Sequence, residues 1–345
     1  MTIAPNPPKI AESASWSEER ERLLRTRVDQ LGLKLEGTRL QPLVRQLHEE
    51  LERAGIDLKP RVFLSDEWGC PEGVPVIGIP FYLVDERLSR LEKEVMETIE
   101  AESDEEILAY LRHEAGHAFN YAYRLYETEE WHALFGPYSR PYREDYEPNP
   151  FSRQYVRHIS GWYAQKHPDE DFAETFAVWL TPSSDWRRVY ADWGCLPKLQ
   201  YVDRVVKRVG RTAPLVSAHY DERDELSYSI AEYHERLAHA PVDVPAYFDG
   251  DLKELFHAGP RPSEGTRDAD AYLRSVRRAV VGNIGYWTGL HEGIVRSLLD
   301  HFAARCTALG LWLHADEHEA TLVKLTAYAT TLCMNRLYKG DFVIK

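Results

Sequence analysis

The sequence predicts an α+β fold that is predominantly helical, with a small N-terminal sheet and a large helical C-terminal part. Residues 61–69 and 74–88 are rich in β-branched and aromatic residues, with glycine and proline between them, which is typical of strands. Residues 16–55 and almost everything after residue 85 instead show the apolar spacing of amphipathic helices. Strands followed by a long run of helices favour an α+β fold.

We expect three segments along the 345 residues of the chain, which are enough for one large domain or two ordinary ones. Residues 1–15 are rich in proline, alanine and serine and are expected to form a disordered tail. Residues 16–194 are expected to form a core that contains the sheet and the candidate site. Residues 195–345 are expected to form a helical C-terminal region.

Composition excludes several classes of protein. A net charge of −14 argues against nucleic acid or an anionic membrane as the main partner. The four cysteines, Cys70, Cys195, Cys306 and Cys333, are scattered and form no C-x-x-C pair, which fits a reducing cytosol. No signal peptide and no apolar run of about 18 residues is visible, so we expect a cytoplasmic protein that does not span a membrane.

A helix is expected over residues 103–126, and it carries the most informative motif, His113-Glu114-Ala115-Gly116-His117. Two histidines four positions apart lie on one face of a helix and can bind one tetrahedral Zn²⁺. Glu114 follows the first histidine and can take a proton from a zinc-bound water. The alternative is a helix that carries His and Glu on its surface with no metal.

A second helix, expected over residues 167–180, offers the third ligand. Glu170 lies 53 positions beyond His117 and shares a helix face with Glu174. We assign Glu170 as the zinc ligand and Glu174 as the acid that holds a ligand histidine in place, although the opposite assignment remains open. Asp171 points about 100° away around the helix and is the weaker candidate.

These two segments resemble a known family. LRHEAGHAFNYAYRLY and YAQKHPDEDFAETFAVWL follow the layout of the glutamate-zincins (gluzincins) and, more narrowly, of the bacterial zinc-binding metallopeptidases. The resemblance covers about residues 100–185 and implies a zincin-like catalytic core, one Zn²⁺ per chain and a protein or peptide substrate. These metallopeptidases often begin with a cysteine zinc ribbon, which this chain lacks, so the ribbon's role in partner binding is not carried over.

Two narrower resemblances concern the second helix. Tyr163, Glu170 and Glu174 reproduce the spacing Y-x6-E-x3-E of lethal-factor-type proteases. The pattern ExxAxxFAxxL resembles that of phage-immunity regulator proteases, and its positions are Glu170, Ala173, Phe176, Ala177 and Leu180, with Pro182 two positions further on.

The resulting interpretation is a zinc metallopeptidase. His113, His117 and Glu170 would hold the metal, and Glu114 would act as general base and then pass the proton to the leaving amine. Tyr163 is a candidate donor to the developing oxyanion, with His158 as its rival and a packing role as the alternative. A regulatory zinc protein without peptidase activity and a hydrolase of non-peptide amides also remain open. The substrate, the cleavage site and the oligomeric state are not given by the sequence.

Three further patterns have both a functional and an ordinary interpretation. Residues 76–84 are a candidate edge strand, to which a substrate could add as a further strand. Pro80 removes one backbone N–H donor from this edge, and the alternative is an ordinary core strand. His314 and His318 are four apart, but no glutamate follows His314, so we expect no metal there. Six aromatic residues line a substrate cleft or pack in the core: Tyr121, Trp131, Phe135, Tyr138, Tyr142 and Trp162.

Overall fold

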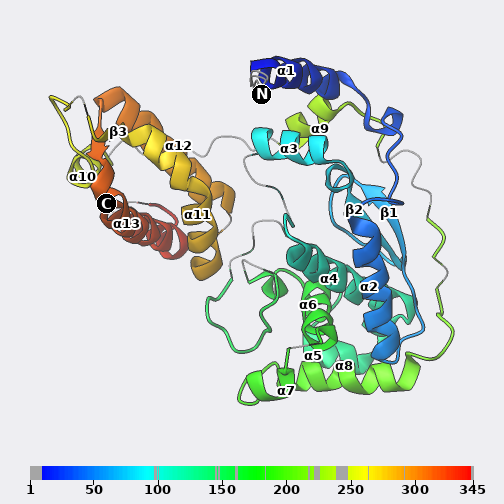
Figure 1. Cartoon of the computed structure of the whole chain (residues 1–345). Coiled ribbons are helices and arrows are strands. Elements are labelled where there is room, and N and C mark those ends of the chain that lie inside the picture. Colours follow the sequence, from blue (N-terminus) through cyan, green and yellow to red (C-terminus); the bar gives the residue numbers. More distant parts are fainter. Residues whose placement is uncertain are drawn as a thin grey trace, which may run out of the picture. The chain divides into compact units, whose positions relative to one another are not determined.

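The structure is a computed structural model. It describes residues 10–342, except for 97, 98, 100, 144, 145, 147, 160, 161, 183, 217, 221–225, 238–247, 263 and 291. The described chain is mostly helical, and its strands form two small two-stranded sheets (Figure 1). The predicted fold class is therefore confirmed. Of the expected disordered tail, residues 1–9 lie outside the described residues, and residues 10–15 begin the first helix.

The chain forms two compact units that alternate along the sequence. Unit 1 contains the described residues of Met1–Thr128, Leu180–Ser183 and Val202–Ala238. Unit 2 contains those of Glu129–Trp179, Ser184–Tyr201 and His239–Lys345. The expected boundary between residues 194 and 195 stays a prediction.

Unit 1 contains the first sheet and the helices around it. Strand β1 (Arg61–Ser65) pairs in parallel with β2 (Val76–Pro80). Every residue of β2 is buried, and Gly78 on its other side bridges Gly69. The helices are α1 (Ile10–Arg25), α2 (Leu40–Arg53), α3 (Glu86–Val95), α4 (Asp104–Ala122) and α9 (Ile230–Leu237), and α4 packs on α2 and β2 (Figure 1).

The strand expected over residues 74–88 is shorter in the structure. Strand β2 ends at Pro80, and a 3₁₀ helix, η2 (Phe81–Val84), follows before α3 begins. Pro80 has no N–H to extend the ladder, and this explains the early end. Glycine is required at position 78, where β2 lies beside β1, because a Cβ there would lie 2.9 Å from Cβ of Ser65.

Unit 2 begins with an aromatic cluster around α6. Phe172 of α6 contacts the rings of Trp131 and Phe135 from α5, and of Tyr201 from α8. These side chains are buried, so the helix is held on its apolar side. The helices of this part are α5 (Glu129–Phe135), α6 (Pro168–Leu180), α7 (Trp186–Val189) and α8 (Leu196–Val209), the last of which continues into unit 1.

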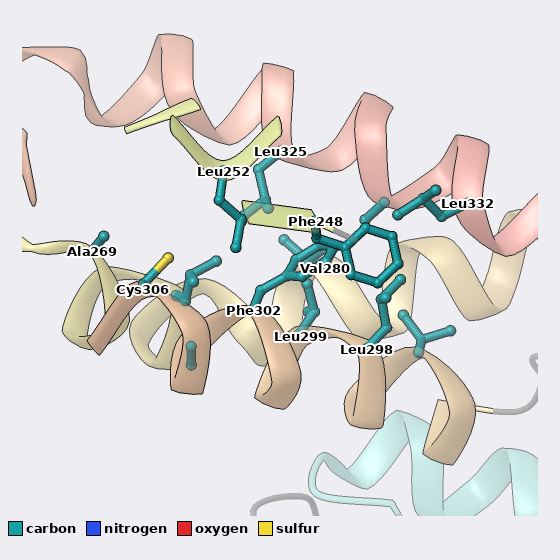
Figure 2. Packing of buried hydrophobic residues seen from close by; sticks show 14 of the residues in the cluster. Phe248, Leu252, Ala269, Val280, Leu298, Leu299, Phe302, Cys306, Leu325 and Leu332 are labelled. Carbon is teal, nitrogen blue, oxygen red and sulfur yellow. The ribbon is translucent and has the colours of Figure 1, made fainter. Parts of the chain in front are cut away.

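The rest of unit 2 is built around a large apolar cluster, which we call the C-terminal cluster (Figure 2). Phe248 and Phe302 meet edge to face at 5.3 Å between ring centroids, with Leu252 and Leu325 packed beside them. Its helices are α10 (Asp249–Leu255), α11 (Ala269–Thr288), α12 (Glu292–Leu309) and α13 (His318–Lys339). The antiparallel pair β3 (Thr266–Asp268) and β4 (Trp312–His314) was not predicted from the sequence.

Within the part of the chain that the structure describes, no helix is both long enough and apolar enough to cross a membrane.

Candidate metal centre

Helix α4 is fixed at its start by a capping box. The backbone N–H of Glu106 donates to Ser103 Oγ at 3.2 Å, and the N–H of Ser103 donates to Glu106 Oε2 at 2.8 Å. Two backbone donors that a helix start leaves unsatisfied are thereby paired. The helix then runs without interruption to Ala122, so His113 and His117 lie one turn apart on the same face.

The two histidine rings meet edge to face, and their Nε2 atoms are 3.1 Å apart. Both residues are buried, at 2% and 7% exposure. Two nitrogens bound to one tetrahedral zinc at 2.0–2.1 Å would be about 3.3 Å apart, which is close to the observed spacing. With both rings neutral, a bound cation could take the Nε2 lone pair of each ring in place of the hydrogen bond between them.

Glu170 supplies the third donor of the group. One ligand atom each from His113, His117 and Glu170 lie within 4.8 Å of one another, and all three residues are buried. Buried charge is costly unless it is paired or bound to a metal. Two imidazole nitrogens and one carboxylate oxygen form a donor set that suits catalytic zinc, so the residues present fit the ion.

The start of α6 is set by His167, a residue that the sequence reasoning missed. Its Nδ1 accepts from the backbone N–H of Asp169 at 3.2 Å, so the ring proton resides on Nε2. That Nε2–H donates to the carbonyl of Arg140 at 2.8 Å. The buried ring thus caps the helix and ties the preceding loop to it. Because Glu170 lies in the first turn, this cap also fixes its position.

The carboxylates of α6 have different partners. Tyr142 donates its hydroxyl to Glu170 Oε1 at 2.7 Å, and the Tyr163 hydroxyl lies 3.3 Å from that of Tyr142. Glu174 Oε2 accepts from the backbone N–H of Ile159 at 2.9 Å. The assignment of Glu174 as the acid that orients a histidine stays a prediction.

Asp171 pairs with Lys198, which the sequence reasoning did not single out. Lys198 Nζ donates to Asp171 Oδ2 at 2.6 Å and to the carbonyl of Gln154 at 2.8 Å. Burial raises the pKa of Asp171 to about 7, while the charge of Lys198 and its hydrogen bond oppose that rise. The pair fixes the rotation of α6, because it holds one polar side of the helix against the start of α8.

The geometry agrees with a comparison to known families. Residues 84–236 match the model of a family described as "Putative zinc-binding metallo-peptidase". The predicted resemblance to the zinc-binding metallopeptidases is confirmed, and the match extends beyond the expected residues 100–185 at both ends. We call residues 84–236 the metallopeptidase segment. No curated protein and no solved structure matches the chain.

The remaining candidates of the metallopeptidase segment lie in or near the irregular stretch before α6. Tyr163 begins a 3₁₀ helix, η4 (Tyr163–Gln165), and its hydroxyl is one hydrogen bond from Tyr142. His158 is partly exposed and lies shortly before it in the chain. The catalytic roles of both residues stay predictions.

The aromatic residues expected to line a cleft or to pack in the core divide into two groups. Tyr121, Trp131, Phe135 and Trp162 are buried, with ring contacts typical of packing. Tyr138 is partly buried and contacts the Trp131 ring as well. Tyr142 is 49% exposed and donates a hydrogen bond to Glu170, which is a more specific contact than lining a cleft would require. The only sequence signal for it is the aromatic richness of the loop.

Among the described residues, the group of His113, His117 and Glu170 is the one set of His, Cys, Asp and Glu with ligand atoms this close together. His314 and His318 belong to no such set in the described chain.

Proposed function

We propose that the protein is a zinc-dependent peptidase in which His113, His117 and Glu170 hold one Zn²⁺ per chain. The single observation that carries this proposal is the buried His-His-Glu group. The family match over the metallopeptidase segment supports it. When bound, zinc would polarise a substrate carbonyl and lower the pKa of a coordinated water to about 7.

Glu114 is the proposed general base. It is buried and follows His113 directly in α4. In this role its carboxylate takes a proton from the attacking water and passes it to the leaving amine, so one residue serves both steps. A site that only holds zinc needs ligands and no such base, and this favours the enzyme over a regulatory zinc protein.

We further propose a protein or peptide substrate and a cytoplasmic location. The substrate class follows from the family match. The location is supported by the cysteines, which are all free. Burial raises the pKa of the Cys195, Cys306 and Cys333 thiols to about 12, so these thiols remain protonated and unreactive at neutral pH.

The test combines zinc content with peptide hydrolysis. Elemental analysis should find about one zinc per chain, and His113→Ala should lose it. Glu114→Gln should keep the zinc and lose roughly 10²- to 10⁴-fold in hydrolysis of a mixed peptide library, because an amide cannot accept the proton. Glu105→Gln, an exposed change in the first turn of the same helix, is the matched control and should leave both unchanged.

Each alternative gives a different result. Full zinc in His113→Ala would remove the proposed site. Wild-type turnover in Glu114→Gln would exclude Glu114 as the base. A zinc-loaded wild type that cleaves no peptide would favour the regulatory protein, or a hydrolase of non-peptide amides if such substrates are turned over.

A further inference from the structure

The loop before α6 places Tyr142 in a fixed position. The His167 ring lies 5.4 Å from the Tyr142 ring and 5.8 Å from that of Tyr138, between centroids. The same histidine donates to the carbonyl of Arg140, two residues before Tyr142. The Lys166 ammonium lies 4.4 Å from the centroid of the Tyr142 ring, within the range of a cation–π contact. The position of Tyr142 is thus determined by Lys166 and His167, the two residues that precede α6.

The Tyr142 hydroxyl makes a short and directional contact with Glu170. An ionised carboxylate only accepts hydrogen bonds, so the tyrosine is the donor in the 2.7 Å contact with Oε1. The Tyr142 oxygen can in turn accept from the Tyr163 hydroxyl at 3.3 Å. Tyr163, Tyr142 and Glu170 then form a chain of hydrogen bonds that all run in one direction and end on the carboxylate.

We propose that Tyr142 is a positioning residue that fixes the carboxylate of Glu170 for metal binding. The inference rests on the proposed function, because it takes Glu170 as a zinc ligand. A carboxylate has two oxygens and can rotate about its terminal bond. A donor held against Oε1 fixes the plane of the group and therefore the direction in which the carboxylate can meet a metal. Hydrogen-bond partners of this kind typically contribute 10- to 100-fold to metal affinity.

The ring and the hydroxyl of Tyr142 have separable roles. The residue is 49% exposed, and its ring contacts His167 and Lys166. Tyr142→Phe keeps the ring contacts with His167 and Lys166 and removes only the hydroxyl, which donates to Glu170 and can accept from Tyr163. A purely structural role would therefore alter the melting temperature of the metal-free protein, whereas a positioning role would alter zinc affinity.

The experiment measures zinc dissociation constants of the full chain by chelator competition. Tyr142→Phe should weaken zinc binding roughly 10- to 100-fold and leave the melting temperature of the metal-free protein unchanged. The visible spectrum of the Co²⁺-substituted variant should also change, because the carboxylate ligand is no longer fixed. Tyr138→Phe is the matched control, since it removes a hydroxyl from the other tyrosine on the His167 ring, and its zinc affinity should stay within about twofold of wild type.

The outcomes separate this inference from the proposed function. A wild-type protein that binds no stoichiometric zinc would refute the proposed function itself. A wild type that binds zinc, together with an unchanged affinity in Tyr142→Phe, would refute only the role of Tyr142. A loss of affinity in Tyr163→Phe but not in Tyr142→Phe would assign the positioning role to Tyr163 and refute the inference for Tyr142. An equal loss in Tyr138→Phe would mean that the loop, and not the hydroxyl, holds the ligand.

Discussion

The interior of the metallopeptidase segment differs sharply in chemistry from the C-terminal cluster. In the segment, both helices of the candidate site bury ionisable side chains, including His113, His117 and Glu170. In the described part of residues 248–342, the buried polar residues are Thr288 and Thr321, and none of the buried residues is charged. The Thr288 hydroxyl donates to the carbonyl of Ile284 within its own helix, so it needs no outside partner.

The comparison distinguishes apolar residues, which stabilise the fold, from buried ionisable residues, which can bind a metal or transfer a proton. Apolar burial contributes roughly 25 cal/mol per Å², whereas a buried charge costs several kcal/mol unless it is paired. The segment keeps its buried charges in pairs such as Lys198 with Asp171. We therefore expect substitutions in the C-terminal cluster to change stability, and substitutions of the buried acids of α6 to change metal binding.

The largest expected effect comes from the acids of α6. Glu170→Ala leaves two histidine ligands, too few for a tight zinc site, while Glu174→Ala should cost only about 10- to 100-fold in zinc affinity. Chelator competition measures both, and Glu129→Ala, an exposed change in α5, is the control. The reverse order would exchange the two assignments. Negligible effects in both would place the third ligand in the 136–160 loop, where His158 is the first residue to test.

The next effect concerns the C-terminal cluster. Phe302→Ala removes a fully buried ring that packs against Phe248 and should lower the free energy of unfolding by about 3–5 kcal/mol. Phe302→Leu is the matched control and should cost less, because it leaves a smaller cavity. Urea unfolding measures the loss, and zinc affinity should remain that of the wild type. A comparable fall in zinc affinity would contradict the division between the two interiors.

A smaller effect is expected at a buried ion pair that joins α2 to α4. Arg112 donates to both carboxylate oxygens of Glu50, at 2.7 and 2.8 Å, and the Glu50 side chain is 1% exposed. Glu50→Gln should lower the free energy of unfolding by about 3 kcal/mol at neutral pH, because it leaves a buried guanidinium without its partner charge. The control is Glu21→Gln, since Glu21 forms an exposed i,i+4 pair with Arg25 that contributes little.

The pH dependence of that loss gives a sharper test. Burial raises the pKa of Glu50, but the hydrogen bonds from Arg112 and Gln46 outweigh it, so the pKa lies below its ordinary value. A lowered folded-state pKa contributes stability above the unfolded value, about 4.3, and the contribution is lost as pH falls through the folded value. The difference between wild type and Glu50→Gln should hold from pH 7 to about 5 and shrink below about 4. If the difference in free energy of unfolding does not change with pH, packing and not the charge of Glu50 causes the loss of stability.

Apart from the grouping of Glu170 with the two histidines, what the sequence could predict was local. The histidine spacing in α4 depends on residues four positions apart, and it was predicted. The helix expected over residues 167–180 was also predicted, and it is α6. The antiparallel pair β3–β4, the contact of Tyr142 with Glu170 and that of Lys198 with Asp171 join residues 27 or more positions apart. No periodicity in the chain encodes such contacts, because they depend on how helices and loops pack.

The position of the proposed ligands along the chain also sets the order in which they become available during protein synthesis. His113 and His117 come from adjacent turns of a helix with its own start signal, whereas Glu170 follows 53 positions later. At translation rates of about 5–20 residues per second, the histidine pair is made roughly 3–10 s before the carboxylate. A metal ion that meets the nascent chain in this interval finds two ligands and exchanges freely. Tight and selective loading therefore has to wait until the second helix has been synthesised and folded.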